Sequence, residues 1–133
     1  MKLHKLLTVL AIVILAGSCK KDNTPNPNVH APARVVRYEL YTDQDFSNNQ
    51  SNIDFTLHMH SNRLNFDSAL ATMKVKDIPD FEHRIIVEKS VPGNDTSTLV
   101  VGFVYQIENV GTSWYLEQFP GQDTLRVVRY SFR

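Results

Sequence analysis

The chain has 133 residues, with 14 basic and 14 acidic side chains and a formal net charge of zero. Its length fits one domain of ordinary size, and a composition of 42% hydrophobic and 21% charged residues excludes a disordered or fibrous chain. Lys and Arg are scattered along the sequence, which argues against a basic face of the kind that binds nucleic acid.

The first segment, residues 1–18, has the pattern of an export signal. Two lysines precede an apolar run from Leu6 to Ala16, and small residues follow it. A helix of that run is only about 16 Å long, whereas a permanent membrane span must cross a hydrocarbon core of about 30 Å. Residues 1–18 are therefore predicted to be a signal peptide and not a membrane-spanning helix.

The end of this segment, Leu15-Ala16-Gly17-Ser18-Cys19, resembles the lipobox of bacterial lipoproteins, which the lipoprotein signal peptidase reads. Ala16 stands where Leu is more usual in that family. The resemblance implies a diacylglycerol thioether on Cys19, cleavage before it, and acylation of the new amino group, for example with palmitate. Cys19 is the only cysteine, so it cannot form an intramolecular disulfide. The alternative is an ordinary secretory signal with an incidental cysteine.

Residues 19–32 are predicted to be a tether between the lipidated Cys19 and the folded domain. The run NTPNPNVHAPA is rich in Pro and Asn, which do not build a core. Lys20 beside Cys19, in place of Asp, resembles outer-membrane and not inner-membrane sorting of Gram-negative lipoproteins. The resemblance implies an exported protein, lipid-anchored in the outer membrane at its periplasmic or cell-surface face.

Residues 33–133 have a dominant hydrophobic period of two. In the run NIDFTLHMH, the residues Ile53, Phe55, Leu57 and Met59 point to one face and the residues between them to the other. Similar runs lie near 34–42, 69–77, 81–91, 98–108, 112–119 and 124–132. About seven strands in roughly 100 residues predict an all-β domain, an immunoglobulin-like antiparallel β-sandwich, with a small β-barrel as the alternative.

The inward positions of these runs predict the core, and only the stretch Asp67 to Met73 resembles a helical turn. The expected core residues are Val36, Tyr38, Leu40, Ile53, Phe55, Leu57, Met59, Ile85, Val87, Val101, Phe103, Tyr105, Ile107, Trp114 and Leu116, joined by Val127 or Val128.

The pentapeptide RVVRY occurs twice, as Arg34–Tyr38 and as Arg126–Tyr130. The flanking sequences are unrelated, so the two copies are not an internal repeat. β-branched, aromatic and long amphipathic side chains favour a strand, and exposed charge is typical of edge strands. Both copies are therefore predicted to be edge strands; an anion site built on the arginines is the alternative.

The loop DQDFSNNQSNID has the ligand spacing of a calcium-binding EF-hand loop. Asp43, Asp45, Ser47 and Asp54 fall at its positions 1, 3, 5 and 12. The match is incomplete, because Asn48 replaces the usual Gly and the last ligand is Asp in place of Glu. The alternatives are a calcium site and an ordinary polar loop between the first two strands.

His58 and His60 project from the same face of one predicted strand, with Asp54 further along that face. Imidazoles at this spacing can chelate zinc, provided that a third or fourth ligand lies close by. A zinc or acid–base site is one reading, and a solvent-facing polar row of a half-exposed sheet is the other.

Three aromatic residues fall in one late predicted strand. Alternation places Trp114 opposite to Tyr115, so we assign Trp114 to the core and expect Tyr115 and Phe119 on the exposed face. An exposed pair of this kind can stack on a sugar or contact a partner protein; packing in the core or across strands is the alternative.

No glycine-rich phosphate loop and no nucleophile elbow occurs in the sequence, so no enzyme activity and no cofactor is predicted, with bound calcium as the alternative. The signal, the tether and the short strand-rich domain resemble the small lipoproteins of the Gram-negative envelope. The leading hypothesis is a lipid-anchored, non-enzymatic binding or structural module for an envelope protein or a glycan. The alternatives are a calcium- or zinc-binding domain, and an inhibitor that presents the loop 92–97 to an envelope hydrolase.

Overall fold

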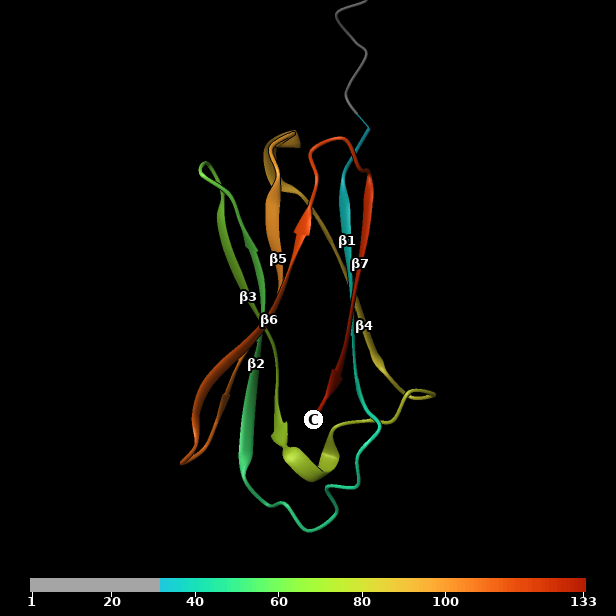
Figure 1. The fold of residues 1–133 in the computed structure, drawn as a ribbon, viewed down its shortest axis with the longest axis vertical. Coiled ribbons are helices and arrows are strands. Elements are labelled where there is room, and N and C mark those ends of the chain that lie inside the picture. The colour runs from blue at the N-terminus through green and yellow to red at the C-terminus, as the bar shows by residue number, and fades with distance from the viewer. Residues whose placement is uncertain (1–31) are drawn as a thin grey trace, which may run out of the picture. The chain divides into compact units, whose positions relative to one another are not determined.

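The computed structural model describes residues 32–133, which form seven β-strands and two short 3-10 turns (Figure 1). The predicted signal peptide, Cys19 and the tether as far as residue 31 lie outside the described residues. The strands are β1 (Val35–Thr42), β2 (Asn52–His60), β3 (Asn65–Lys74), β4 (Ile85–Ser90), β5 (Leu99–Ile107), β6 (Gly111–Phe119) and β7 (Leu125–Phe132), and the turns are η1 (Val75–Asp77) and η2 (Pro92–Asn94). Within the described range, neither turn has the length or the apolar character of a membrane-crossing helix.

The strands are divided between two sheets that form the two layers of a sandwich. One sheet has the order β4-β1-β7 and the other the order β3-β2-β5-β6, and Figure 1 shows them on opposite sides of the domain. Residues 32–133 show no closure of the sheets into a barrel. The prediction of an all-β sandwich is confirmed at this level, and the barrel alternative is wrong.

One strand pair is parallel, whereas the prediction was an antiparallel sandwich throughout. β1 pairs with β7 in parallel, whereas the other four pairs are antiparallel. Because β1 and β7 are the first and last strands, no tight hairpin forces them to run in opposite directions. β1 pairs with β4 on its other side, so it is the central strand of its sheet. The edge-strand prediction is wrong for Arg34–Tyr38 and confirmed for Arg126–Tyr130.

The core lies between the two sheets, as the period of two predicted. Every second residue of β2, from Ile53 to Met59, is at most 1% exposed. The other fully buried residues of the predicted core are Val36, Tyr38, Leu40, Val101, Phe103 and Val128, and Ile85, Val87, Tyr105 and Ile107 pack against them while partly buried.

The side chains of β6 that point inward are those predicted to point outward, and the reverse. Trp114 is 66% exposed and Leu116 is 37% exposed, whereas Phe119 is fully buried and Tyr115 packs against the core. Tyr115 lies directly opposite the buried Phe103 of β5, and residues opposite one another in a strand pair share a face. The register with β5 therefore decides which aromatic side chains of β6 are buried.

The segment Asp67–Met73, predicted to be a helical turn, lies within β3. The register of β3 with β2 shifts between Phe55 and Thr56, which leaves Leu70 as an extra residue in β3. A bulge of this kind interrupts the alternation of side chains. The interruption explains why the strand pattern is obscured in this part of the sequence.

Candidate metal centre

His58 and His60 lie on the outer face of the four-stranded sheet. Side chains alternate between the two faces of a strand, and the alternate residues Leu57 and Met59 are buried on the inner face. The pairing of β2 with β3 places Asp67 directly opposite His58. Opposed residues of an antiparallel pair have Cβ atoms about 4.5–5.5 Å apart, so their side chains meet. The fold thus brings both predicted histidines together with a carboxylate from the next strand.

The three side chains converge on one carboxylate oxygen. Oδ1 of Asp67 is 2.8 Å from Nδ1 of His58 and 3.4 Å from Nε2 of His60. The two imidazole rings stack with their centroids 3.8 Å apart and 27° between their planes. One possible ligand atom from each residue lies within 4.8 Å of the others, and this is the one such group found in residues 32–133.

His60 carries a ring nitrogen without a partner. Its Nε2 is buried and makes no hydrogen bond within the described chain, although Oδ1 of Asp67 lies close to it. A buried polar atom without a partner costs on the order of 1–3 kcal/mol. A metal ion would supply the missing partner, since zinc accepts imidazole nitrogen at about 2.0–2.1 Å and carboxylate oxygen at about 2.0–2.2 Å.

The contact between His58 and Asp67 determines the tautomer of His58. An ionised carboxylate only accepts hydrogen bonds, so Nδ1 of His58 carries the proton in this 2.8 Å contact. A metal ion that displaces this proton would bind Nδ1 of His58, Nε2 of His60 and Oδ1 of Asp67, the three atoms that converge here. Asp67 has two roles open to it: it can be a direct ligand, or it can orient a ligating imidazole, as carboxylates beside metal-bound histidines commonly do.

Two neighbours of His58, Tyr38 and Gly102, fix the local backbone on which the site is built. The buried hydroxyl of Tyr38, from the other sheet, donates a 2.9 Å hydrogen bond to the carbonyl oxygen of His58. Burial, with a smaller contribution from the charge of Asp67, raises the pKa of Tyr38 and keeps it protonated as a donor. On the β5 side, His58 faces Gly102, where a Cβ atom would lie 2.0 Å from the carbonyl oxygen of Tyr115. Glycine is needed at this position because the backbone of β6 approaches it closely.

The four predicted calcium ligands do not converge. The carboxylate of Asp43 accepts a hydrogen bond from a β7 serine at 2.8 Å, and that of Asp45 accepts one from the backbone N–H of Ser47 at 2.9 Å. Asp54 is already in β2 and accepts a 2.6 Å hydrogen bond from a β3 threonine. The carboxylates of Asp43, Asp45 and Asp54 are thus bound to three different parts of the fold, and the polar-loop alternative describes this segment. Asp54 is also not the third member of the histidine cluster.

Tyr115 and Phe119, predicted to form an exposed aromatic face, are turned inward. The ring of Tyr115 stacks on Tyr130 with centroids 4.8 Å apart and 17° between the planes. The ring of Phe119 lies 4.1 Å from the guanidinium carbon of Arg34. The prediction of a ligand face built from Tyr115 and Phe119 is therefore wrong, and the exposed aromatic residue of β6 is Trp114.

Arg34 has a structural role that was not predicted. Arg34 is 4% exposed, and its guanidinium uses all five N–H donors on backbone carbonyls at 2.6–3.2 Å. The acceptors belong to Asp95, Ser97, Phe119, Pro120 and Asp123. No donor remains for an anion. The available signal in the sequence was that Arg34 shares its strand parity with the core residues Val36 and Tyr38.

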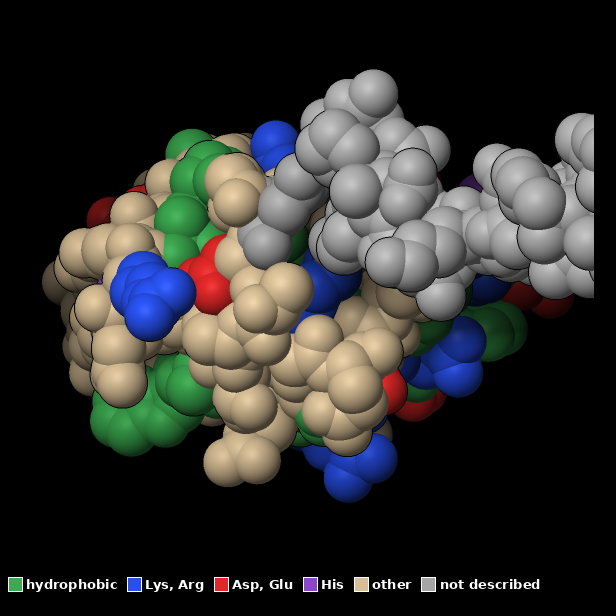
Figure 2. All heavy atoms as spheres, turned by 90° about the horizontal axis from the view of Figure 1, so that it is seen from above, with side chains coloured by type: hydrophobic (Ala, Val, Ile, Leu, Met, Phe, Trp, Pro, Cys, Tyr) green, Lys and Arg blue, Asp and Glu red, His purple; other side chains and the backbone are tan. Residues whose placement is uncertain are grey.

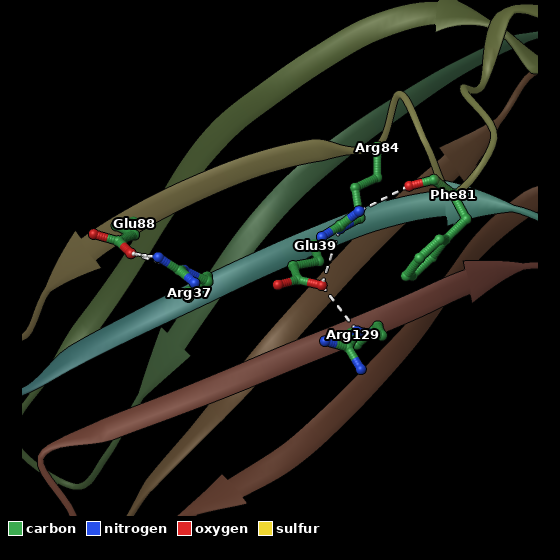
Figure 3. A network of polar contacts seen from close by, with 6 residues as sticks. All are labelled: Arg37, Glu39, Phe81, Arg84, Glu88 and Arg129. Carbon is green, nitrogen blue, oxygen red and sulfur yellow. Dashed lines mark hydrogen bonds and ion pairs between the residues drawn. The ribbon is translucent and has the colours of Figure 1, made fainter.

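A second polar cluster lies on the outer face of the three-stranded sheet (Figure 3). Oε2 of Glu39 is 2.8 Å from Nε of Arg129 and 3.3 Å from Nε of Arg84, although Glu39 is only 3% exposed. Arg84 in turn stacks on the ring of Phe81. The hydrogen bond from Arg129 is the main cause that lowers the pKa of Glu39. Because the two arginines share the one buried carboxylate, the cluster is a structural network.

The charged side chains do not gather into a single patch on the face seen in Figure 2. Lys and Arg side chains lie apart from one another there, separated by other residues. This agrees with the scattered basic residues of the sequence.

No protein-family model matches the chain, and neither a curated protein nor a solved structure is similar enough to count as a match. The function is therefore inferred from the chain's own residues and geometry.

Proposed function

We propose that the protein is a lipid-anchored lipoprotein of the bacterial envelope whose β-sandwich binds a zinc-class metal ion through His58, His60 and Asp67. The observation that carries the metal proposal is the convergence of two imidazoles on one carboxylate oxygen, with Nε2 of His60 buried and without a hydrogen bond among residues 32–133. The role is one of binding and not of catalysis.

The donor set favours a transition metal over calcium. Two nitrogens and one carboxylate suit zinc, copper or nickel, whereas calcium takes six to eight oxygen ligands. Three protein ligands leave one tetrahedral position for water or for a group of a partner. The side chains of His58, His60 and Asp67 are 16%, 32% and 50% exposed, so an ion and a partner group can both reach the site.

The anchoring proposal rests on Cys19 and on the sequence around it. The lipobox, Lys20 and the Pro/Asn-rich tether support export and attachment to the outer membrane, at its periplasmic or cell-surface face. In this position the sandwich would meet envelope proteins and glycans. The partner is therefore proposed to be one of these and not a nucleic acid.

The finer fold assignment, an immunoglobulin-like sandwich, is also a proposal. Its support is the pairing of the second strand with the fifth, which constant-type immunoglobulin domains share. The outer neighbours of that pair differ, since β3 and β6 flank it here where the first and fourth strands do in those domains. We propose a relationship of architecture and not of strand connectivity.

An inhibitor role for the loop 92–97 has no specific observation in its favour. The carbonyl groups of Asp95 and Ser97 in this loop accept hydrogen bonds from Arg34 at 2.6 and 2.9 Å. These groups hold the loop to the sandwich and are not available to pair with an enzyme.

The test of the metal proposal is thermal unfolding of the full chain in detergent, first treated with a chelator and then supplied with zinc or calcium. A ligand present at 100 times its Kd stabilises the folded state by about 2.7 kcal/mol, which corresponds to several degrees in Tm for a domain of this size. We expect this rise with zinc and no rise with calcium.

Matched variants assign the effect to the site. His60→Ala and Asp67→Asn should abolish the zinc-induced rise in Tm. His83→Ala, at an exposed histidine paired with Asp80, and Asp54→Asn should retain it. Zinc stabilisation that survives both His60→Ala and Asp67→Asn, or no zinc binding by calorimetry, would refute the metal proposal.

A further inference from the structure

The sandwich has four edge strands among its described residues, and three of them carry the features that discourage pairing with another chain. Edge strands are commonly protected by charged side chains, by Pro or by a bulge. The charges are Glu88 and Lys89 in β4, Arg126 and Arg129 in β7, and Asp67 and Lys74 in β3. β3 also contains a bulge, where its register with β2 shifts.

β6 is the exception. It contains no Lys, Arg or Pro, and its register with β5 runs without a shift from one end to the other. Its single charge, on Glu117, is held by Arg126 of β7 and by the hydroxyl of Tyr115. The first half of the strand, Gly111–Tyr115, is the uncharged sequence GTSWY.

Most of this half of β6 is exposed on both faces, and only Tyr115 is turned toward the core. The four consecutive residues from Gly111 to Trp114 are all exposed, although neighbouring residues of a strand point to opposite faces. Figure 1 shows the β5–β6 hairpin extending away from the three-stranded sheet. Its turn and its edge carry the two most exposed large apolar side chains of the described chain, Val110 at 77% and Trp114 at 66%. Exposed Trp is typical of protein interfaces.

We propose that the segment Gly111–Tyr115 pairs with the same segment of a second copy of this chain, so that the four-stranded sheets of two molecules join edge to edge. Antiparallel pairing of a strand with its own copy is two-fold symmetric, the commonest symmetry of protein dimers. It gives partners to the N–H and C=O groups that a free edge leaves unpaired.

The charge pattern favours a second copy as the occupant. In every antiparallel register of Gly111–Tyr115 against itself, an uncharged residue lies opposite an uncharged residue, so no like charges meet. The two Trp114 side chains would lie on the same outer face of the joined sheet. A pairing of five residues is smaller than a standard stable interface, so the dimer is weak and depends on concentration.

The dimer is independent of the proposed metal site. β5 lies between β6 and β2 in the sheet, so His58 and Asp67 remain uncovered when β6 pairs with its copy. The experiment is therefore performed with a chelator present, which excludes contacts bridged by a metal ion.

Disulfide trapping tests the proposal in the full chain purified in detergent. With Cys19→Ser, an introduced cysteine is the only thiol. We expect Ser113→Cys to give disulfide-linked dimers on mild oxidation, because directly opposed residues of an antiparallel pair approach the Cβ spacing of a disulfide, most closely at non-hydrogen-bonded positions. Thr112→Cys and Trp114→Cys cover the adjacent registers. The matched control is Ser90→Cys, an exposed serine on the edge strand β4, which should stay monomeric.

A charge variant provides the second arm. Thr112→Lys, added to the more efficiently trapped of Ser113→Cys and Trp114→Cys, should lower the cross-linked fraction at least tenfold while circular dichroism and Tm stay unchanged, since Thr112 is exposed. The proposal is overturned if all three β6 cysteines cross-link no more than Ser90→Cys, which would leave the edge for a foreign strand. It is equally overturned if Thr112→Lys has no effect on trapping.

Discussion

The two copies of RVVRY lie side by side in one sheet and yet have different surroundings. Arg34–Tyr38 in β1 and Arg126–Tyr130 in β7 run parallel, offset by two residues. Both copies turn their first, third and fifth residues inward. β1 has a strand on each side, whereas β7 has one neighbour and a free edge. The same five residues thus specify the same strand and the same facing, and the position in the sheet decides what each side chain does.

The first arginine of each copy shows the difference most clearly. Arg34 is 4% exposed and is held by five backbone carbonyls, from two loops and from the end of β6. Arg126 pairs with the carboxylate of Glu117, and their side chains are 37% and 20% exposed. An arginine removed from water needs every donor satisfied, whereas one at the edge is partly solvated and needs few partners.

The largest expected effect comes from Arg34→Met. We expect the free energy of unfolding to fall by about 3–5 kcal/mol, because five carbonyls lose a charged donor and several are left without partners. Urea unfolding of the full chain, followed by circular dichroism, measures the loss. A loss below 1 kcal/mol would show that the buried copy has no greater role than the edge copy.

Glu39, the residue after the first copy, joins the two copies through Arg129. We expect Glu39→Gln to cost about 2 kcal/mol at pH 7, since a buried carboxylate bound by two arginines is removed. The pairing lowers the pKa of Glu39 from its ordinary value of 4.5. Its contribution is therefore complete above about pH 4.5 and is lost as the pH falls through the lowered pKa.

Urea unfolding of wild type and Glu39→Gln between pH 7 and pH 2 tests this. The two curves should converge in acid. A difference that stays constant over the whole range would assign the effect to packing and not to the charge.

The sequence predicted the strands well where local pattern decides them. The alternation from Ile53 to Met59 located β2 and its buried face, because the inner residues are all apolar. The prediction from alternation failed where pairing with a neighbouring strand decides which side chains are buried. Trp114 is larger and more apolar than Tyr115, but the register with β5 turns Tyr115 inward beside the buried Phe103.

The candidate site was predicted only in part, because one of its three residues comes from a neighbouring strand. The spacing of His58 and His60 placed them on one face from the sequence alone. Asp67 became the third member only because β3 pairs with β2 in a register that sets Asp67 against His58. Asp54, the carboxylate nearest in sequence, instead accepts a hydrogen bond from the hydroxyl of Thr72. No single-strand pattern carries this information.

The fifth residue of each copy allows a milder test. The hydroxyl of Tyr38 donates to the carbonyl of His58 across the core, whereas that of Tyr130 donates to the hydroxyl of Tyr105. We expect Tyr38→Phe to cost about 1 kcal/mol, because a carbonyl of the other sheet loses its side-chain partner. Tyr130→Phe should cost about half as much, since Tyr105 is partly buried and its hydroxyl can turn to water. Equal losses in urea unfolding would contradict this ranking.

The smallest expected effect is that of Arg126→Met, and its dependence on salt separates the two copies. The Arg126–Glu117 pair is partly exposed, so its loss should cost less than about 1 kcal/mol at low ionic strength. Added salt screens partly exposed charges, and the cost should shrink further near 1 M NaCl, where the Debye length is about 3 Å. The cost of Arg34→Met should persist, because its carbonyl partners are lost whatever the salt. A salt-independent loss of several kcal/mol in Arg126→Met would mean that an edge position does not weaken the role of this arginine.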